Sequence, residues 1–188
     1  MKVTINAKTV GQLINGDTVN LYAENKEIVQ TIRKVEAEAL KIFISYSHKD
    51  NEIKDKLITH LAPLYRSGSI IAWSDSNILP GEEWDFKIRK SLDESSIILL
   101  LLSADFIISE YIWKSEVLPA IEKYEKKEAV VIPIMCRACM FDEMPYAKFQ
   151  GLPKNMIPIA DHANIDQVLT EIVKSIKIIT NQLILRQA

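Results

Sequence analysis

Polar side chains that could bind a ligand or transfer a proton gather just after a short apolar run near residue 42. The run 42–44 is followed by hydroxyl, imidazole and carboxylate groups: Ser45, Tyr46, Ser47, His48 and Asp50. A buried strand that ends this way places such groups at the carboxyl edge of a sheet, where open α/β proteins bind their ligands. His48 has no evident partnering nucleophile, so we expect a surface histidine rather than a general base.

The segments around this cluster alternate between apolar runs of strand length and amphipathic helical patterns. Strands are predicted over residues 42–45, 70–73, 97–102, 130–135 and 156–159, and helices over residues 51–66, 82–92, 104–127 and 165–179. Strands that alternate with helices form parallel sheets with right-handed crossovers. The sequence therefore predicts an α/β, flavodoxin-like fold, in which a five-stranded parallel sheet of order 2-1-3-4-5 is flanked by helices.

Residues 1–40 form a separate N-terminal segment, and the main domain is expected over residues 41–188. Asn15-Gly16 between two short apolar arms predicts a hairpin, and residues 23–40 carry one apolar stripe at helical spacing. Because an isolated hairpin is marginal in water, this segment is expected to pack on the main domain or to pair with a second copy. An oligomerisation or regulatory role is the corresponding hypothesis.

Composition and charge narrow the class of protein. The chain is 48% hydrophobic and 26% charged, as in an ordinary soluble protein, and its net charge of −2 argues against nucleic acid as a direct partner. No secretory signal is recognisable. The run 97–102 is much shorter than the roughly 20 residues that cross a bilayer. We therefore expect a cytoplasmic protein with no membrane partner.

Motifs for metals or nucleotide cofactors are weak or missing from the sequence. Cys136 and Cys139 have C-x-x-C spacing, but no second Cys or His pair would complete a zinc site. They follow a late strand, so two reduced thiols and no metal site are expected. No glycine-rich dinucleotide or triphosphate motif is present. Ser103 stands where a response-regulator receiver would need an Asp.

An ordered set of motifs lies at the ends of the predicted strands. The motifs are Phe43-Ile44-Ser45-Tyr46-Ser47 with Asp50, Trp73-x-Asp75, Leu79-Pro80-Gly81-Glu82-Glu83-Trp84, Ser91 and Ser109-x-x-x-Trp113-x-x-Glu116. Each is weak alone, but the ordered set resembles the Toll/interleukin-1 receptor (TIR) domain family from about residue 41 to about residue 179. With a carboxylate at Glu116, it looks closest to the bacterial and plant-like branch that cleaves NAD.

The resemblance implies that Glu116 is the catalytic residue and that NAD+ is a substrate, with no further cofactor. Cleavage of the nicotinamide–ribose bond passes through an oxocarbenium-like state, which a carboxylate beside the ribose stabilises. Nicotinamide leaves as a neutral ring, so no general acid is needed. On spacing alone Glu116 would be a solvated helix residue paired with Lys114 or Lys123, and only the resemblance favours catalysis.

The helix that carries Glu116 departs from the family pattern at two positions. Many cleaving members have a Trp four residues before the Glu, whereas here Ile112 holds that position and Trp113 stands three residues before it. Both stacking on a ligand and packing into the core therefore stay open for Trp113. Pro119 removes the backbone donor that would bond to Ser115, which predicts a bend just after Glu116.

The resemblance also implies a set of substrate-binding residues: Tyr46, Ser47, Trp73, Asp75, Leu79, Trp84 and Trp113. Tyr46 and Ser47 would line the nicotinamide pocket. Residues 74–84 correspond to a loop that, in the family, closes over the substrate and joins neighbouring domains. From the residues alone, Asp75 could equally cap a helix and Trp73 could equally pack in the core.

The leading hypothesis is a TIR-type NAD+ glycohydrolase or ADP-ribosyl cyclase that releases nicotinamide and is activated by self-association. The resemblance also implies a bacterial antiphage or immune-type signalling role, with a sensor or effector protein as a further partner. The alternative is a non-catalytic adaptor that acts through TIR–TIR contacts. A nucleoside 2-deoxyribosyltransferase would use a similar sheet and a glutamate, but the Leu79-Pro80-Gly81-x-x-Trp84 loop weighs against it.

Overall fold

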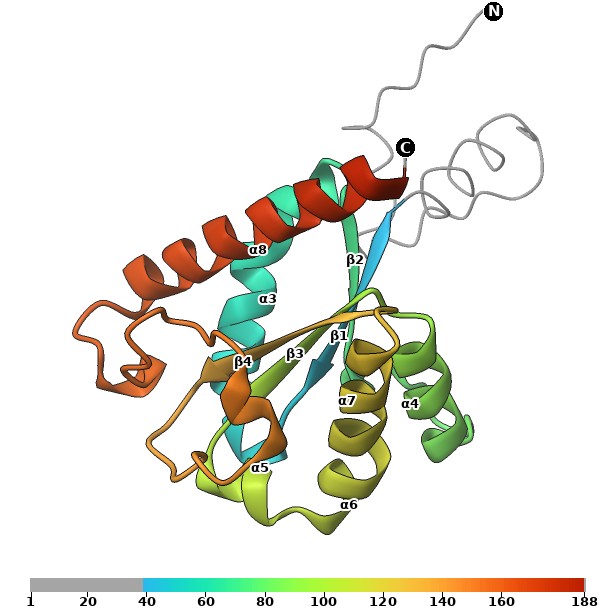
Figure 1. Cartoon of the computed structure of the whole chain (residues 1–188), viewed down its shortest axis with the longest axis horizontal. Helices are drawn as coiled ribbons and strands as arrows, with labels where there is room; N and C mark the ends of the chain where they lie inside the picture. Colours follow the sequence, from blue (N-terminus) through green and yellow to red (C-terminus); the bar gives the residue numbers. More distant parts are fainter. Residues whose placement is uncertain (1–38, 188) are drawn as a thin grey trace, which may run out of the picture.

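A four-stranded parallel sheet forms the centre of residues 39–187, the part of the chain that the computed structural model describes. Its strands are β1 (Leu40–Ser45), β2 (Ile70–Trp73), β3 (Ile97–Leu102) and β4 (Val130–Met135), in the order β2-β1-β3-β4 (Figure 1). Every strand pair is parallel. The predicted α/β, flavodoxin-like class is confirmed, whereas the predicted hairpin and helix of the N-terminal segment lie outside the described residues.

The fifth strand predicted over residues 156–159 is wrong. Within the described part of the chain, the outer side of β4 pairs with only one residue, Leu152, through a single bridge. The Leu152 N–H donates to the Pro133 carbonyl at 2.8 Å, and the Leu152 carbonyl accepts from the Met135 N–H at 2.8 Å. A turn closed by a 2.8 Å bond from the Met156 N–H to the Pro153 carbonyl then carries the chain away. Proline has no N–H to extend a ladder, so the pairing ends after one residue. Ile159 instead begins a 3₁₀ turn, Ile159–Asp161.

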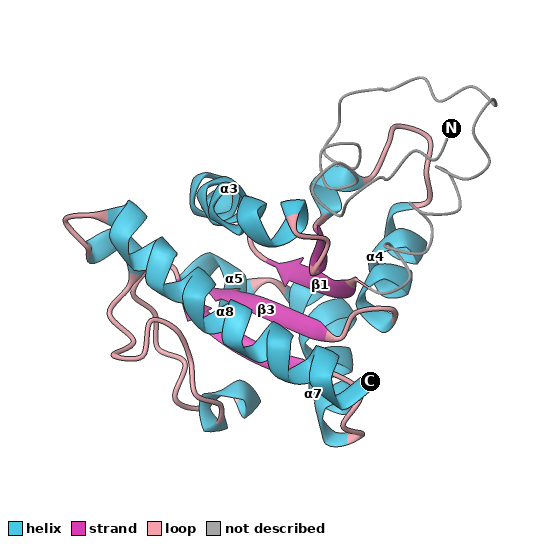
Figure 2. Ribbon diagram, turned by 90° about the horizontal axis from the view of Figure 1, so that it is seen from above, coloured by secondary structure: helices cyan, strands magenta, loops and turns pink. Residues whose placement is uncertain are grey.

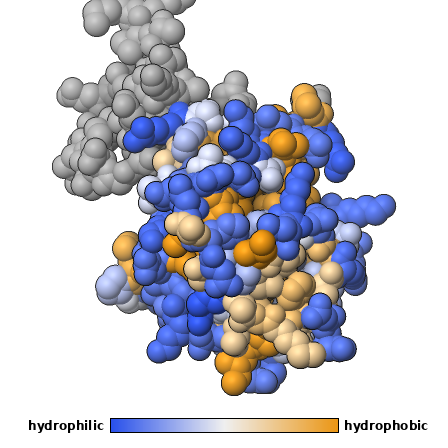
Figure 3. Space-filling model, turned by 90° about the vertical axis from the view of Figure 1, so that its left-hand side faces the viewer, coloured by the Kyte–Doolittle hydropathy of each residue, from blue (hydrophilic) through white to orange (hydrophobic). Residues whose placement is uncertain are grey.

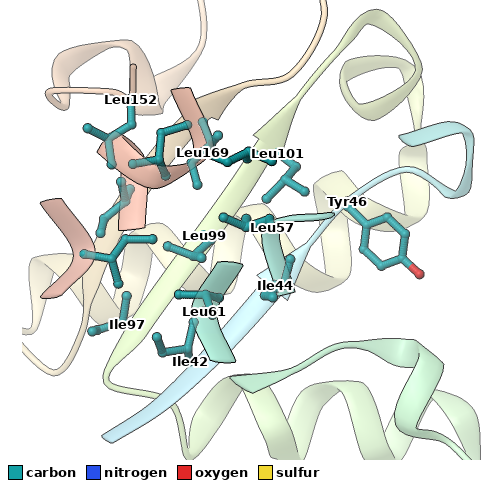
Figure 4. Packing of buried hydrophobic residues seen from close by; sticks show 14 of the residues in the cluster. Ile42, Ile44, Tyr46, Leu57, Leu61, Ile97, Leu99, Leu101, Leu152 and Leu169 are labelled. Carbon is teal, nitrogen blue, oxygen red and sulfur yellow. The ribbon is translucent and has the colours of Figure 1, made fainter. Parts of the chain in front are cut away.

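Helices cover both faces of the sheet. Every residue of β3 is therefore buried, and the strand side chains alternate between two cores. Helices α3 (Asn51–Arg66) and α8 (Ile165–Gln187) pack on one face, and α4 (Trp84–Asp93) and α7 (Leu118–Glu125) on the other (Figures 1 and 2). Figure 4 shows the first core, where aliphatic side chains interdigitate between the sheet and its helices.

The long helix predicted over residues 104–127 is broken in the structure. It consists of α5 (Ala104–Ile108), α6 (Glu110–Ile112), a π-helical turn (Trp113–Val117) and α7. Ser109 has an extended backbone and its hydroxyl accepts from the Ile112 N–H, so it ends one helix and caps the next. A sequence pattern of apolar spacing does not detect such a break, because both pieces bury the same face.

The surface of the domain is mixed, and polar side chains are interspersed with small apolar areas on the face drawn in Figure 3. Large hydrophobic side chains that are exposed include Leu79, Phe86, Ile108 and Met140. Among the described residues, the helices are all too short or too polar to span a membrane.

Candidate active site

A cleft of about 270 Å³ opens at the carboxyl edge of the sheet, where β1 and β2 end. Its volume is near the lower end of small-molecule pockets, which begin at about 300 Å³. Its lining comes from β1 and the following loop, β2 and the following loop, α4 and the segment around α6: Phe43, Ile44, Tyr46, Ser47, His48, Lys49, Trp73, Asp75, Trp84, Ile88, Ser109, Tyr111, Ile112 and Glu116. Segments distant in the sequence therefore meet at one site, as expected for an open α/β sheet.

Glu116 is the buried carboxyl group of this cleft, with 7% of its surface exposed. The hydroxyl of Ser45, the last residue of β1, donates a hydrogen bond to its Oε2 at 2.5 Å. Burial raises the pKa of Glu116 to about 7, and the nearby Asp75 carboxylate adds to that rise. The Ser45 hydrogen bond acts in the opposite direction, and so does the positive charge that His48 carries when it is protonated. Near neutral pH this group can hold or release a proton.

The π-helical turn that carries Glu116 follows from the local sequence. Its closing bond runs from the Leu118 N–H to the Trp113 carbonyl, one residue further than in an α-helix. Pro119 has no N–H to bond to Ser115, so the regular pattern cannot pass through this point. The sequence predicts a bend just after Glu116, whereas the structure has a wider turn that contains it. Such turns occur often at functional sites.

Asp75 joins the two loops that border the cleft. The Tyr46 hydroxyl donates to its Oδ1 at 2.6 Å, and Nε2 of His48 lies 2.5 Å from its Oδ2. Burial and the Asp75 carboxylate raise the pKa of Tyr46, so the phenol stays protonated and acts as the donor. Figure 4 shows the Tyr46 ring at the edge of the aliphatic core, with its hydroxyl directed away from the other side chains of that cluster. Both carboxylate oxygens of Asp75 are thus engaged within the protein.

Aromatic rings form one wall of the cleft. Trp73 stacks on Phe43, with ring centroids 5.4 Å apart. Trp84 packs on Tyr111 at 4.4 Å, and the Tyr111 hydroxyl donates to Asp85 at 2.9 Å. The wall therefore ties α4 to the segment that carries Glu116.

A second polar network joins the loop that follows β1 to the loops that follow two other strands. Asp50 is buried and accepts hydrogen bonds from the Ser103 hydroxyl and from Nε of Arg137, each at 2.6 Å. Arg137 also pairs with Asp105, and the hydrogen bonds to Asp50 and then to Asp105 raise the pKa of Arg137. The network connects the loops that follow β1, β3 and β4. Among residues 39–187, no group of three or more His, Cys, Asp or Glu side chains is arranged to hold a metal ion.

Comparison with known proteins agrees with this architecture. A family model described as "TIR domain" matches residues 42–169. The chain belongs to the TIR domain family. It is also similar to the uncharacterized protein y4lF of Sinorhizobium fredii, with 38% identity over 136 residues. That alignment covers 72% of this chain and 42% of the relative, so the chain spans less than half the length of that protein.

The TIR domain brings five of the predicted binding residues into the cleft with Glu116: Tyr46, Ser47, Trp73, Asp75 and Trp84. Leu79 and Trp113 lie outside the cleft lining. Leu79 is 67% exposed on the loop before α4, and Trp113 packs against the apolar cluster beside β3. The structure therefore has Trp113 partly buried against the core, and its stacking on a ligand stays an untested prediction.

Sequence reasoning missed several cleft residues of this TIR domain. The sequence places Ser45 in the polar cluster after the first strand but not beside Glu116, and it places Tyr111 and Ile112 within a continuous helix with no role in a site. His48 is largely exposed, as expected, but it lines the cleft and bonds to Asp75. The available signal was positional: His48 and Asp75 each follow one of two neighbouring parallel strands, whose carboxyl ends must meet.

Proposed function

We propose that this TIR domain cleaves NAD+ at the bond between nicotinamide and ribose, with Glu116 as the catalytic carboxylate. The proposal is carried by one observation: a buried glutamate, with a pKa raised to about 7, lies in the cleft at the carboxyl edge of the sheet. Among residues 39–187, no cationic side chain forms a hydrogen bond with this buried carboxylate, so its ionised form is poorly stabilised. A cationic ligand would supply the missing charge.

The chemistry suits a single carboxylate. The bond between C1′ and the ring nitrogen breaks, its electron pair goes to the ring, and nicotinamide leaves neutral. Positive charge then develops on the ribose, beside Glu116, whose anion stabilises it in an environment of low dielectric. The cationic nicotinamide ring would also lower the pKa of Glu116 on binding, so that the carboxylate is ionised when it is needed. Water completes hydrolysis to ADP-ribose, and an internal nucleophile would give a cyclic form.

The cleft lining suits the remaining parts of such a substrate. The rings of Trp73 and Trp84 offer flat faces for nicotinamide or adenine, and stacking of this kind contributes about 1–3 kcal/mol per base. Lys49 lies at the rim with its side chain exposed, where its charge suits a diphosphate. Ser47 supplies a hydroxyl at the same edge. Because Asp75 is engaged by Tyr46 and His48, we assign it no direct contact with ribose.

Self-association is part of the proposal. Leu79 and Phe86 are 67% and 55% exposed, and they lie beside the cleft on the loop before α4 and on α4 itself. A neighbouring copy that covers them would also close the cleft from bulk water. A role in immune-type signalling, with a sensor or effector as a further partner, completes the hypothesis.

The test is nicotinamide release by the purified full chain incubated with NAD+, with and without a crowding agent, followed by chromatography. Replacing Glu116→Gln should lower release by about 100-fold or more. The matched control is Glu110→Gln, because Glu110 lies in the preceding turn, is exposed, and pairs with Lys114 at 2.7 Å outside the cleft. Equal release from wild type and Glu116→Gln would reject the site.

The competing function is a non-catalytic adaptor that acts through TIR–TIR contacts. The exposed Leu79 and Phe86 serve an adaptor as well as an enzyme. An adaptor does not need Glu116, so its ionisation would be incidental. A wild-type protein that assembles, as measured by light scattering, and still leaves NAD+ intact would favour the adaptor over the enzyme.

A further inference from the structure

His48 and Asp75 form a hydrogen-bonded pair inside the candidate cleft, with His48 Nε2 and Asp75 Oδ2 2.5 Å apart. His48 follows β1 and Asp75 follows β2, and these strands are paired in register up to Phe43 opposite Trp73. The sheet backbone therefore fixes the positions from which both side chains start. Both residues line the cleft together with Glu116.

The two members of the pair differ in exposure and in the number of hydrogen bonds that hold them. Asp75 has 16% of its side chain exposed and is held from the other side by the Tyr46 hydroxyl at 2.6 Å. The His48 side chain is 69% exposed, so a proton that it accepts can pass to bulk water. Asp75 is thus a fixed anchor, and His48 is the member that can meet a reactant.

The pairing determines which ring nitrogen of His48 is available. An ionised carboxylate only accepts hydrogen bonds. In the neutral His48 ring, Nε2 therefore carries the hydrogen and donates the hydrogen bond that Asp75 accepts. The basic lone pair of the His48 ring then lies on Nδ1. This nitrogen has no hydrogen-bond partner among residues 39–187 and is free to accept a proton. A carboxylate that orients an imidazole in this way also stabilises the imidazolium formed when the free nitrogen takes a proton.

We infer that His48 is the general base for the water that attacks the ribose, with Asp75 as its positioning residue. This rests on the proposed cleavage of NAD+. The water oxygen bonds to C1′, and the bond from C1′ to nicotinamide breaks with its electron pair on the ring nitrogen. One water proton moves to Nδ1 of His48 and then to solvent. Glu116 stabilises the sugar cation and His48 accepts the proton, so the two roles belong to different residues.

The test compares two nucleophiles that attack the same sugar cation. Wild type and variants are incubated with NAD+ and 3-acetylpyridine, and the products are separated. Water and other O–H nucleophiles must lose a proton, whereas the pyridine nitrogen has none to lose. His48→Gln and Asp75→Asn should each lower the ratio of hydrolysis products to exchanged dinucleotide at least tenfold. Imidazole added to His48→Gly should restore the ratio.

The matched control is His60→Gln, because His60 pairs with Asp166 at 3.2 Å between α3 and α8, outside the cleft. Its ratio should equal that of wild type. An unchanged ratio in His48→Gln, or an equal loss of both products, would overturn the role of His48 while leaving NAD+ cleavage in place. Absence of nicotinamide release from wild type would instead reject the proposed function itself.

Discussion

The Ser45 hydroxyl donates a hydrogen bond to Oε2 of Glu116 at 2.5 Å, which joins the end of β1 to the π-helical turn. This bond is the strongest of the influences that lower the pKa of Glu116 against the effect of burial. The two residues are far apart in the sequence, and neither alone indicates a site. Their contact provides a direct way to change the ionisation of Glu116 without removing it.

Replacing Ser45→Ala should raise the pKa of Glu116 above its value of about 7, because the hydrogen bond to the carboxylate is lost. Nicotinamide release at pH 7 should fall several-fold and should recover towards wild type at higher pH. The measurement is a pH–rate profile of kcat/KM for both proteins. Ser67→Ala, at the far end of α3, serves as control. Superimposable profiles for wild type and Ser45→Ala would show that the bond does not control ionisation.

Replacing Glu116→Gln should stabilise the protein at alkaline pH. The pKa of Glu116 is raised in the folded state, so its favourable protonated form is fully present below about pH 4.5 and is lost as the pH rises through about 7. Gln has no such loss. Urea denaturation should show the variant more stable than wild type at pH 8.5, by up to roughly 3 kcal/mol, and similar to it near pH 4. A difference independent of pH would argue against a titrating Glu116.

Replacing Arg137→Ala should destabilise the fold by about 3 kcal/mol, because it leaves the buried Asp50 carboxylate without its cation. The double variant Arg137→Ala with Asp50→Asn should recover part of that loss. Thermal or urea unfolding measures both effects. Lys56→Ala, which breaks an exposed pair with Glu52, should leave stability unchanged. Equal unfolding of Arg137→Ala and wild type would exclude the network as a support of the loops.

Replacing Trp84→Ala should raise the KM for NAD+ by about 5- to 150-fold, because the proposed stacking of its ring on a base of the substrate contributes about 1–3 kcal/mol. The kcat should change much less, since Trp84 is proposed to bind a ring of the substrate and not to act on the reacting bond. Trp84→Phe keeps a ring and should stay near wild type. Steady-state kinetics would contradict this prediction if kcat fell while KM did not change.

The sheet could be predicted from the sequence because its strands are continuous apolar runs with clear ends. Residues 70–73, 97–102 and 130–135 match the observed β2, β3 and β4, and residues 51–66 match α3. The fifth strand failed for a local reason. Apolar residues at 156–159 have strand composition, but the turn at Pro153 directs them away from β4, and only Leu152 reaches it.

The candidate site was predictable in its residues but not in their partners. Motif order brought out Glu116, Trp73 and Trp84, all of which line the cleft. The bonds from Ser45 to Glu116 and from His48 to Asp75 depend on strand register and side-chain rotamers. Neither quantity is encoded in the spacing of single residues, so only the folded chain reveals them.

The widened turn at Trp113–Val117 makes the position of Glu116 sensitive to the insertion or deletion of a single residue. The turn holds one more residue than an α-helical turn, so deleting one there, such as the exposed Lys114, would restore ordinary helical winding and leave α7 in place on the sheet. The residues inside the turn would change position, and the contact between Glu116 and Ser45 would be lost while the sheet and its cores stay unaffected. A single codon inserted or removed at this place would therefore separate a domain that has the buried Ser45–Glu116 contact from one that lacks it.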